Sequence, residues 1–239
     1  MRAVLFDLGN TLVSYYAAAD FAPILRQGLR GCVQALPGRP HTRDEEELFQ
    51  RALAMNVERN DYSVWPLIDR LGELFGYEAL DSPATEQKLI TAFLAPIFAT
   101  AAPDPEAVRA LATLRAAGFA TAIVSNTPWG SPAPQWRGEL DRHNLLAAVD
   151  AAVFCVDVGY RKPHHAPFER ALSLLDVQPA DAVFVGDDPR WDVIGAKQAG
   201  LQPLLLAPRH TAPADDGVPV VRSLAEVLDR VTTLRSPAA

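Results

Sequence analysis

The chain has 239 residues, 49% of them apolar, which is enough for one α/β domain with a smaller insertion and a sizeable core. Its 29 acidic and 22 basic residues give a net charge of −7, which argues against nucleic acid and favours small-molecule partners. The apolar run before Asp7 is too short for a signal peptide or a membrane span. Cys32 and Cys155 stand far apart in apolar settings, so we expect a cytoplasmic protein with buried free thiols and no membrane partner.

The amino-terminal segment predicts a short buried strand followed by a helix. Residues 3–7 are Ala-Val-Leu-Phe-Asp, a β-rich run, and Gly9-Asn10 then supplies a tight turn. Beyond Val13 the pattern changes, because apolar residues recur at helical spacing over residues 21–36. Pro37-Gly38 ends this first predicted helix.

Three further helices are expected before residue 99. The second begins at Thr42 and Glu45, which match a capping box, and runs to about Val57. The third covers residues 64–75, and the fourth begins at Ser82-Pro83, a suitable cap and first helical position. Residues 15–98 are therefore predicted to form an all-helical insertion.

From residue 105 onward the predicted helices and strands alternate, which indicates a parallel sheet. The expected order is helix 105–117, strand 121–126, helix 135–146, strand 151–156, helix 165–175, strand 182–187, helix 192–199, strand 203–207, edge strand 218–221 and helix 224–231. The predicted fold class is α/β, a Rossmann-like parallel sheet flanked by helices and interrupted by the helical insertion. No glycine-rich fingerprint follows the first strand, so dinucleotide binding is not expected.

Polar residues follow the carboxyl ends of several predicted strands, where a parallel sheet gathers its functional groups in one crevice. These residues are Asp7, Ser125, Lys162 and Asp187. They supply a nucleophilic carboxylate, a hydroxyl donor, a fixed cation and a metal-binding carboxylate. In-line attack on phosphorus requires this combination of groups.

Four motifs carry a resemblance to a known family. They are Val4-Leu-Phe-Asp-Leu-Gly-Asn-Thr-Leu12, Ile123-Val-Ser-Asn126, Gly159-Tyr-Arg-Lys-Pro163 and Val183-Phe-Val-Gly-Asp-Asp188. In this order they resemble the haloacid dehalogenase-like hydrolase superfamily over roughly residues 1–14 and 100–225. The resemblance implies a core domain of residues 1–14 and 99–239, with a helical cap domain of residues 15–98.

The resemblance also implies roles for single residues. Asp7 would attack the phosphoryl group and form an aspartyl phosphate that water hydrolyses. Lys162 would hold the Asp7 carboxylate and the phosphoryl group close together despite their repulsion. Substrate contacts would come from Asn10, Thr11, Ser125, Asn126 and Lys162. Oxygen ligands for Mg²⁺ would come from Asp7, the Gly9 backbone carbonyl, Asp187 and Asp192, with Asp192 acting through water or by orienting Lys162. The partner would be a small phosphorylated substrate.

Gly9 departs from the family pattern, which normally has at this position a second aspartate that protonates the leaving oxygen and later activates water. Loss of such a group costs on the order of 10²–10⁴ in rate. A substitute acid from Tyr15, Tyr16 or His41, a substrate with a low-pKa leaving group, or a loss of turnover would each account for the glycine.

Alternative functions follow from the same departure. A carbon–halogen hydrolase lacks the second aspartate but typically lacks the acidic metal site as well, and a phosphonate-cleaving enzyme needs a cap lysine, for which Lys88 is the candidate. A non-catalytic protein that binds phosphate ligands is a further alternative.

The substrate and the oligomeric state, monomer or homodimer, stay open. Possible selectors of substrate are Arg26, His41, Arg59 and Tyr62 in the cap and Trp129 in the core, whereas Arg161, His164-His165 and the turn residue Asp188 are weaker site candidates.

Overall fold

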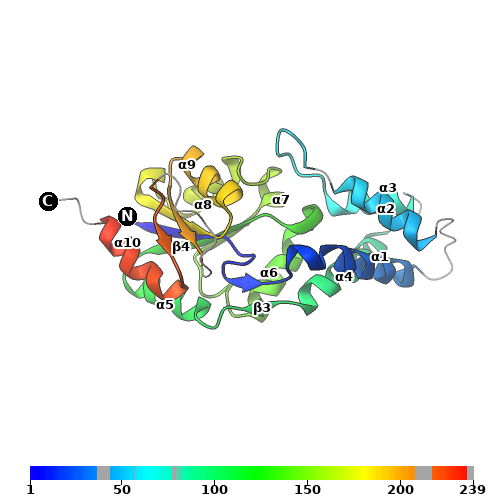
Figure 1. The fold of residues 1–239 in the computed structure, drawn as a ribbon, viewed down its shortest axis with the longest axis horizontal. Helices are drawn as coiled ribbons and strands as arrows, with labels where there is room; N and C mark the ends of the chain where they lie inside the picture. Colours follow the sequence, from blue (N-terminus) through cyan, green and yellow to red (C-terminus); the bar gives the residue numbers. More distant parts are fainter. Residues whose placement is uncertain (37–43, 57, 77–79, 81, 208–216, 236–239) are drawn as a thin grey trace.

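The computed structural model describes residues 1–36, 44–56, 58–76, 80, 82–207 and 217–235. It has a six-stranded parallel sheet flanked by helices, with a helical cap beyond the carboxyl ends of the strands (Figure 1). The predicted fold class, a Rossmann-like α/β sheet with a helical cap, is therefore confirmed. No helix among the described residues has the length and apolar character needed to cross a bilayer.

The sheet places the amino-terminal strand between two strands from the second half of the chain. Its order is β5 (Ala151–Phe154), β4 (Ala120–Ser125), β1 (Ala3–Phe6), β6 (Ala182–Gly186), β7 (Gln202–Leu206) and β8 (Val220–Val221). Phe6 pairs with Ile123 on one side and with Val185 on the other. The residues that follow these three positions therefore emerge side by side at one edge.

Alternate residues of β1 face opposite sides of the sheet, as the two-residue period of a strand requires. Val4 and Phe6 belong to the larger apolar cluster, whereas Ala3 and Leu5 belong to the smaller one. The larger cluster is covered by α5 (Ala107–Ala116), α6 (Ala133–Arg142) and α10 (Val227–Arg235), and the smaller one by α8 (Ala166–Leu175) and α9 (Gly195–Gln198). Because all four β1 residues are fully buried, β1 reads as a continuous apolar run.

The predicted strands and helices of the core are present, with three local differences. Cys155 and Val156 begin the short helix α7 (Cys155–Val158) instead of ending a strand. Residues 189–194 form a π-helical turn, η5 (Pro189–Ile194), so the helix predicted over residues 192–199 is α-helical only from Gly195. Residues 224–226 form a 3₁₀ turn, η6 (Leu224–Glu226), before α10.

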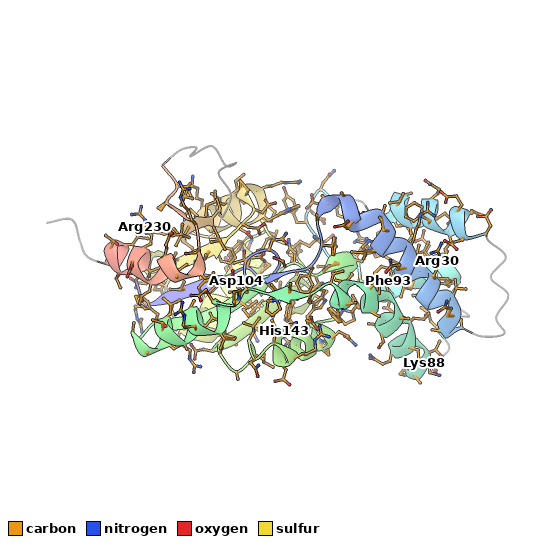
Figure 2. The ribbon with its side chains drawn as sticks, turned by 60° about the horizontal axis from the view of Figure 1, so that its bottom comes forward. Arg30, Lys88, Phe93, Asp104, His143 and Arg230 are labelled. Carbon is orange, nitrogen blue, oxygen red and sulfur yellow. The ribbon has the colours of Figure 1, made fainter. Side chains whose placement is uncertain are left out.

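Among its described residues the cap has four α-helices, which are α1 (Phe21–Ala35), α2 (Glu45–Met55), α3 (Leu67–Phe75) and α4 (Pro83–Ala99). Helices α1 and α4 lie side by side, with Phe93 between them (Figure 2). A side chain on Gly28 would lie 2.9 Å from the Phe93 carbonyl oxygen, and one on Gly31 would lie 3.0 Å from that of Ala92. Two glycines on one face of α1 therefore allow the close approach of these helices.

The two predicted helix starts in the cap have different outcomes. Ser82 caps α4 by accepting a hydrogen bond from the Thr85 amide, as predicted. Helix α2, however, is capped by Asp44, which accepts from the Glu47 amide. The predicted cap residue Thr42 and the end of that helix at Val57 lie outside the described residues.

Two connections join the cap to the sheet. Strands β2 (Val13–Ser14) and β3 (Ala102–Pro103) pair antiparallel where the chain leaves the core and returns. The loop of residues 58–66, called here the cap loop, contacts the segment before Lys162 through an isolated bridge between Ser63 and Tyr160. Two backbone hydrogen bonds flank this bridge, from the Val64 amide to the Gly159 carbonyl (2.8 Å) and from the Arg161 amide to the Tyr62 carbonyl (2.8 Å).

Both cysteines are buried and free, as predicted. Cys32 lies between α1 and α4, and its thiol contacts the Leu89 carbonyl. Burial raises the pKa of Cys32. The Cys155 sulfur accepts a hydrogen bond from the Thr127 amide. Both thiols are part of the packed interior, and neither belongs to the cluster of Asp7, Asp187 and Asp192.

Candidate active site

The carboxyl ends of β1, β4 and β6 bring the predicted polar residues together. Asp7 follows β1, and its amide donates to the Val185 carbonyl of β6. Ser125 ends β4, and Asp187 follows β6 directly. Asp7, Asp187 and Asp192 each offer a carboxylate oxygen, and these three oxygens lie within 4.8 Å of one another.

Lys162 joins two of these carboxylates. Its ammonium nitrogen lies 2.6 Å from Asp7 Oδ1 and 2.7 Å from Asp192 Oδ1, and the residue is only 1% exposed. Burial lowers the pKa of Lys162, but the charges of Asp192 and Asp7 outweigh that effect and raise the pKa. Lys162 is therefore a fixed cation between the nucleophile candidate and the acid on η5.

Asn126 holds the backbone of Lys162 from both sides. Its amide oxygen accepts from the Lys162 amide at 2.8 Å, and its amide nitrogen donates to the Lys162 carbonyl at 3.1 Å. Asn126 was predicted as a substrate contact, and the structure gives it this second task of orienting the lysine loop relative to β4. The sequence offered no sign of the pairing, because 36 positions separate the two residues.

The cluster has three carboxylates and one buried ammonium group, which contacts two of them. Negative charge is therefore left uncompensated. Burial raises the pKa of Asp187 to about 7, and the charges of Asp7, Asp192 and Asp188 contribute to the same shift. Burial also raises the pKa of Asp192, while its ion pair with Lys162 opposes the shift. An excess of oxygen ligands with raised pKa values fits a divalent cation such as Mg²⁺.

The turn after β6 positions these acids. A side chain at Gly186 would overlap the Asp192 carboxylate, so only glycine allows η5 to approach the strand this closely. Asp188 accepts hydrogen bonds from the amides of Arg190 (2.7 Å) and Trp191 (2.9 Å), which identifies it as the residue that caps η5. The Asp188 amide in turn donates to Asp192 Oδ2 at 3.1 Å.

A cavity of about 190 Å³ lies beside Asp7, the nucleophile candidate, and several other predicted site residues line it. Gly9, Asn10 and Ser125 line it, together with Asn126 and Tyr15. Thr11, also predicted as a substrate contact, is buried and is not among the lining residues, and its hydroxyl has no partner among the described residues.

Tyr15 lines this cavity, and the protonation state of its hydroxyl bears on proton transfer. Its hydroxyl is buried and has no hydrogen-bond partner among the described residues. Burial, aided by the charges of Glu139 and Asp7, raises the pKa of Tyr15, so the phenol stays protonated. The ring meets Trp136 edge-on, with centroids 5.6 Å apart.

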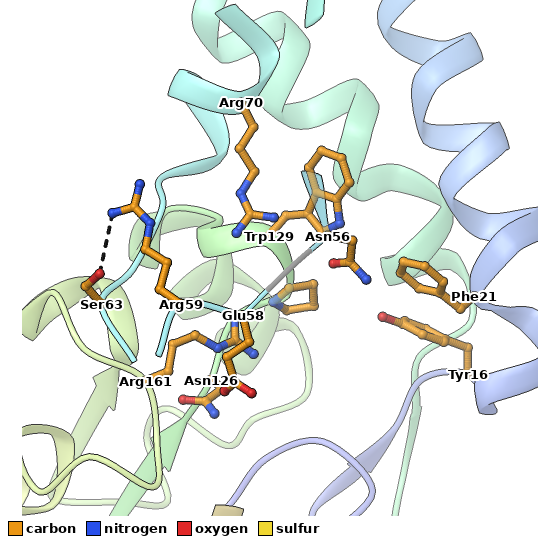
Figure 3. Close-up of a pocket in the computed structure, with 11 residues that line it drawn as sticks. Tyr16, Phe21, Asn56, Glu58, Arg59, Ser63, Arg70, Asn126, Trp129 and Arg161 are labelled. Atoms are coloured by element: carbon orange, nitrogen blue, oxygen red, sulfur yellow. Dashed lines mark hydrogen bonds between the residues drawn. The ribbon is translucent and has the colours of Figure 1, made fainter. Parts of the chain in front are cut away.

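A second cavity, of about 330 Å³, lies between the cap and the core. Figure 3 shows that its lining comes from both parts, with Arg59 and Arg70 from the cap and Trp129 and Arg161 from the core. Trp129 packs against Phe93, with centroids 5.1 Å apart. Arg70 was not predicted as a site residue, because an arginine in an amphipathic helix cannot be told by sequence from a polar residue on the solvent face.

Other candidates lie away from both cavities. Arg26 pairs with Glu46 on the cap, and Tyr62 packs edge-on against Trp191. His164 stacks on Tyr160 and His165 pairs with Glu169, so neither histidine joins the acidic group. Lys88 lies near the start of α4, away from the sheet in the view of Figure 2, and lines neither cavity. His41 is outside the described residues.

An aspartate, a bridging lysine and an acidic pair thus meet at the strand ends of a parallel α/β sheet. The family model of the haloacid dehalogenase-like hydrolases matches residues 1–200, so the chain belongs to this family. The family recognised from the four sequence motifs is thereby confirmed.

Three similar proteins illustrate the range within the family. The glyceraldehyde 3-phosphate phosphatase of Methanothermobacter thermautotrophicus is 26% identical over 98% of both chains. The (S)-2-haloacid dehalogenase 1 of a Pseudomonas species is 28% identical over 84% of this chain and 82% of the relative. The crystal structure of a HAD phosphatase from Thermococcus onnurineus covers 97% of this chain and 98% of its own, with a TM-score of 0.69 and 24% identity.

The raised pKa of Asp187 predicts a pH-dependent affinity for Mg²⁺. A carboxylate must lose its proton to bind the cation, and the Asp187 pKa of about 7 means that protons compete increasingly as the pH falls. We expect calorimetric titration to show an affinity that decreases about tenfold per pH unit below pH 7. The Asp187→Asn variant should bind Mg²⁺ weakly and with a shallower dependence on pH. Equal affinities of the natural chain at pH 8 and pH 6 would contradict the prediction.

Proposed function

We propose that this hydrolase is a Mg²⁺-dependent phosphatase that acts on a small phosphorylated metabolite through an aspartyl phosphate at Asp7. The observation that carries this proposal is the position of Lys162, buried between Asp7 and Asp192 with Asp187 beside them. A site that binds a phosphate dianion next to several carboxylates needs positive charge, which Lys162 and a bound cation would supply together.

In the proposed reaction, a carboxylate oxygen of Asp7 attacks phosphorus as the bond to the leaving oxygen breaks. Lys162 offsets the repulsion between Asp7 and the phosphoryl oxygens, and the Ser125 hydroxyl donates to one of those oxygens. Asn126 keeps the lysine loop in register with β4. Water then attacks the aspartyl phosphate and regenerates the carboxylate.

Asp7, Asp187, Asp192 and the Gly9 carbonyl would hold Mg²⁺, which supplies charge neutralisation for the phosphoryl group when bound. Asp192 already contacts Lys162, so we assign it the orientation of the lysine and a contact through water. The division into a core of residues 1–14 and 99–239 and a cap of residues 15–98 is part of the proposal. The β2–β3 pair lies at that boundary.

The leaving group needs a proton that Gly9 cannot provide. Tyr15 and Tyr16 are the candidate substitutes among the described residues, because both line the same cavity as Gly9 and burial raises the pKa of both. A phenol with a raised pKa can donate a hydrogen bond to the leaving oxygen but gives up its proton poorly. We therefore expect the enzyme to prefer substrates whose leaving group needs little protonation.

Carbon–halogen hydrolysis is the second candidate, favoured by Gly9 and by the similarity to a haloacid dehalogenase. Such a reaction releases a halide that needs no proton. The cluster of three carboxylates argues against this reaction. A haloacid is itself an anion, so the carboxylates would repel it, and it has no phosphoryl group that a bound cation could hold beside them.

The test is release of inorganic phosphate from a panel of phosphorylated metabolites, with Mg²⁺ and with a chelator, beside release of halide from 2-haloacids. We expect phosphate release that requires Mg²⁺ and no halide release. Halide release that persists with the chelator would identify the second candidate. Binding of Mg²⁺ and phosphate without turnover of any compound would favour the non-catalytic alternative.

A further inference from the structure

The larger cavity between cap and core carries three arginines: Arg59 and Arg70 from the cap and Arg161 from the core. Figure 3 shows Arg70 and Arg161 extending toward the same space, while Arg59 turns toward Ser63. We call this cavity the arginine pocket. The cap loop and residues 159–161, which contact each other, both supply residues that line it.

Arg70 is an unusual component because it is only 5% exposed. Its Nε donates to the Trp65 carbonyl at 3.2 Å and its Nη1 to the Met55 carbonyl at 3.0 Å, so the guanidinium is held in place by backbone groups. Burial, together with the charges of Arg161 and Arg59, lowers the pKa of Arg70 to about 10. The fold thus holds like charges close together in a partly desolvated space.

The other two arginines are also held by neutral partners. Arg161 donates from Nη1 to the Thr127 carbonyl at 3.2 Å, and Arg59 approaches the Ser63 hydroxyl at 3.4 Å. Within the part of the chain that the structure describes, Arg59, Arg70 and Arg161 form no ion pair with a carboxylate. Of the three, Arg70 is buried, Arg161 is half-buried and Arg59 is exposed. A buried charge without a counter-ion is costly, and a ligand anion would supply the charge opposite to that of Arg70.

The acid in the lining, Glu58, does not neutralise the pocket. Its carboxylate pairs with Arg190 of η5 at 2.7 Å. The arginine pocket therefore keeps an excess of positive charge, in a protein whose net charge is −7.

The arginine pocket adjoins the site of the proposed reaction. Tyr16, Asn126 and Pro128 line both this cavity and the one beside Gly9 and Ser125. A small molecule whose phosphate lies at Asp7 can therefore extend past Asn126 toward the arginines.

We propose that the arginine pocket binds a second anionic group of the substrate, so that the preferred substrates are phosphate monoesters that also carry a carboxylate or a second phosphate. This inference rests on the proposed phosphatase function. Guanidinium groups bind either anion through paired N–H donors.

The test compares matched pairs of substrates in the presence of Mg²⁺. One pair is phosphoglycolate and 2-hydroxyethyl phosphate, and the other is propane-1,3-diol bisphosphate and 3-hydroxypropyl phosphate. We expect kcat/KM to be at least about tenfold higher for the member with the second anion. The pair with the larger ratio distinguishes a carboxylate from a phosphate as the preferred group.

Within each pair, the ratio of the two kcat/KM values does not depend on the fraction of folded enzyme. We expect Arg161→Gln to lower the larger ratio about tenfold, toward one. Arg26→Gln is the matched control, since that arginine lies outside the pocket and pairs with Glu46. Ratios near one in the natural chain, or ratios that survive both Arg161→Gln and Arg59→Gln, would overturn the proposal.

A binding measurement separates failure of this inference from failure of the phosphatase function. Phosphonoacetate and ethylphosphonate differ by the carboxylate, and their binding requires no turnover. With Mg²⁺ present, calorimetry should show phosphonoacetate binding about tenfold or more tightly, and Arg161→Gln should remove the difference. Equal affinities in the natural chain would refute the pocket assignment even if phosphate monoesters are hydrolysed.

Discussion

Replacing Asp7 with asparagine is expected to reduce phosphate release by about 10⁴-fold or more, because the amide is a poor nucleophile and forms no acyl phosphate. The same change removes the ion pair between Asp7 Oδ1 and Lys162. The fold should survive, since Asp192 still contacts the buried ammonium. Single-turnover assays with Mg²⁺ on the most active substrate of the panel would measure the loss.

The control for this variant is Asp141→Asn, the same change on an exposed residue of α6. We expect it to keep the activity of the natural chain. Thermal unfolding should give similar midpoints for both variants, which would show that Asp7→Asn loses activity in the chemical step and not through unfolding. If Asp7→Asn retained turnover within about tenfold of the natural rate, covalent catalysis by Asp7 would be refuted.

Much of the core was predictable because its strands are short apolar runs, and β1, β4 and β6 each end in a polar residue or shortly before one. In a parallel sheet this pattern specifies both the fold and the edge at which functional groups meet. Asp7, Ser125 and Asp187 were placed at that edge on this basis, and the structure brings them there. The precise ends of elements were less predictable, since Cys155 could equally end a strand or begin a helix.

Contacts between distant segments were not predictable from local patterns. The bridge between Ser63 and Tyr160, and the ion pair between Glu58 and Arg190, depend on how the cap lies on the core. Arg70 illustrates the same limit, since its burial follows from packing of α3 against the cap loop and Trp129. The arginine pocket therefore emerged from the structure, although Arg59 and Trp129 had been suggested as selectors and Arg161 as a weaker site candidate.

Replacing Gly9 with aspartate is expected to increase kcat about 10²–10⁴-fold for substrates with alcohol leaving groups, because it would supply the missing general acid. The backbone permits the change. Gly9 is not among the glycines with positive φ, and an added Cβ would meet no atom within 4 Å. The new side chain would lie at the cavity that Asn10, Tyr15 and Ser125 also line.

The neighbouring charges favour this outcome. Asp7 and Asp187 would raise the pKa of the added carboxyl group, so that it starts protonated, as an acid catalyst must. The measurement is kcat/KM for a series of phosphate esters with graded leaving-group pKa. In the natural chain the rate should fall steeply as that pKa rises, and in Gly9→Asp the dependence should flatten. Gly9→Asn, which matches the aspartate in shape but cannot donate an acidic proton, should behave like the natural chain. If both variants behaved alike, the glycine would not be the cause of weak acid catalysis, and Tyr15 would become the donor to test.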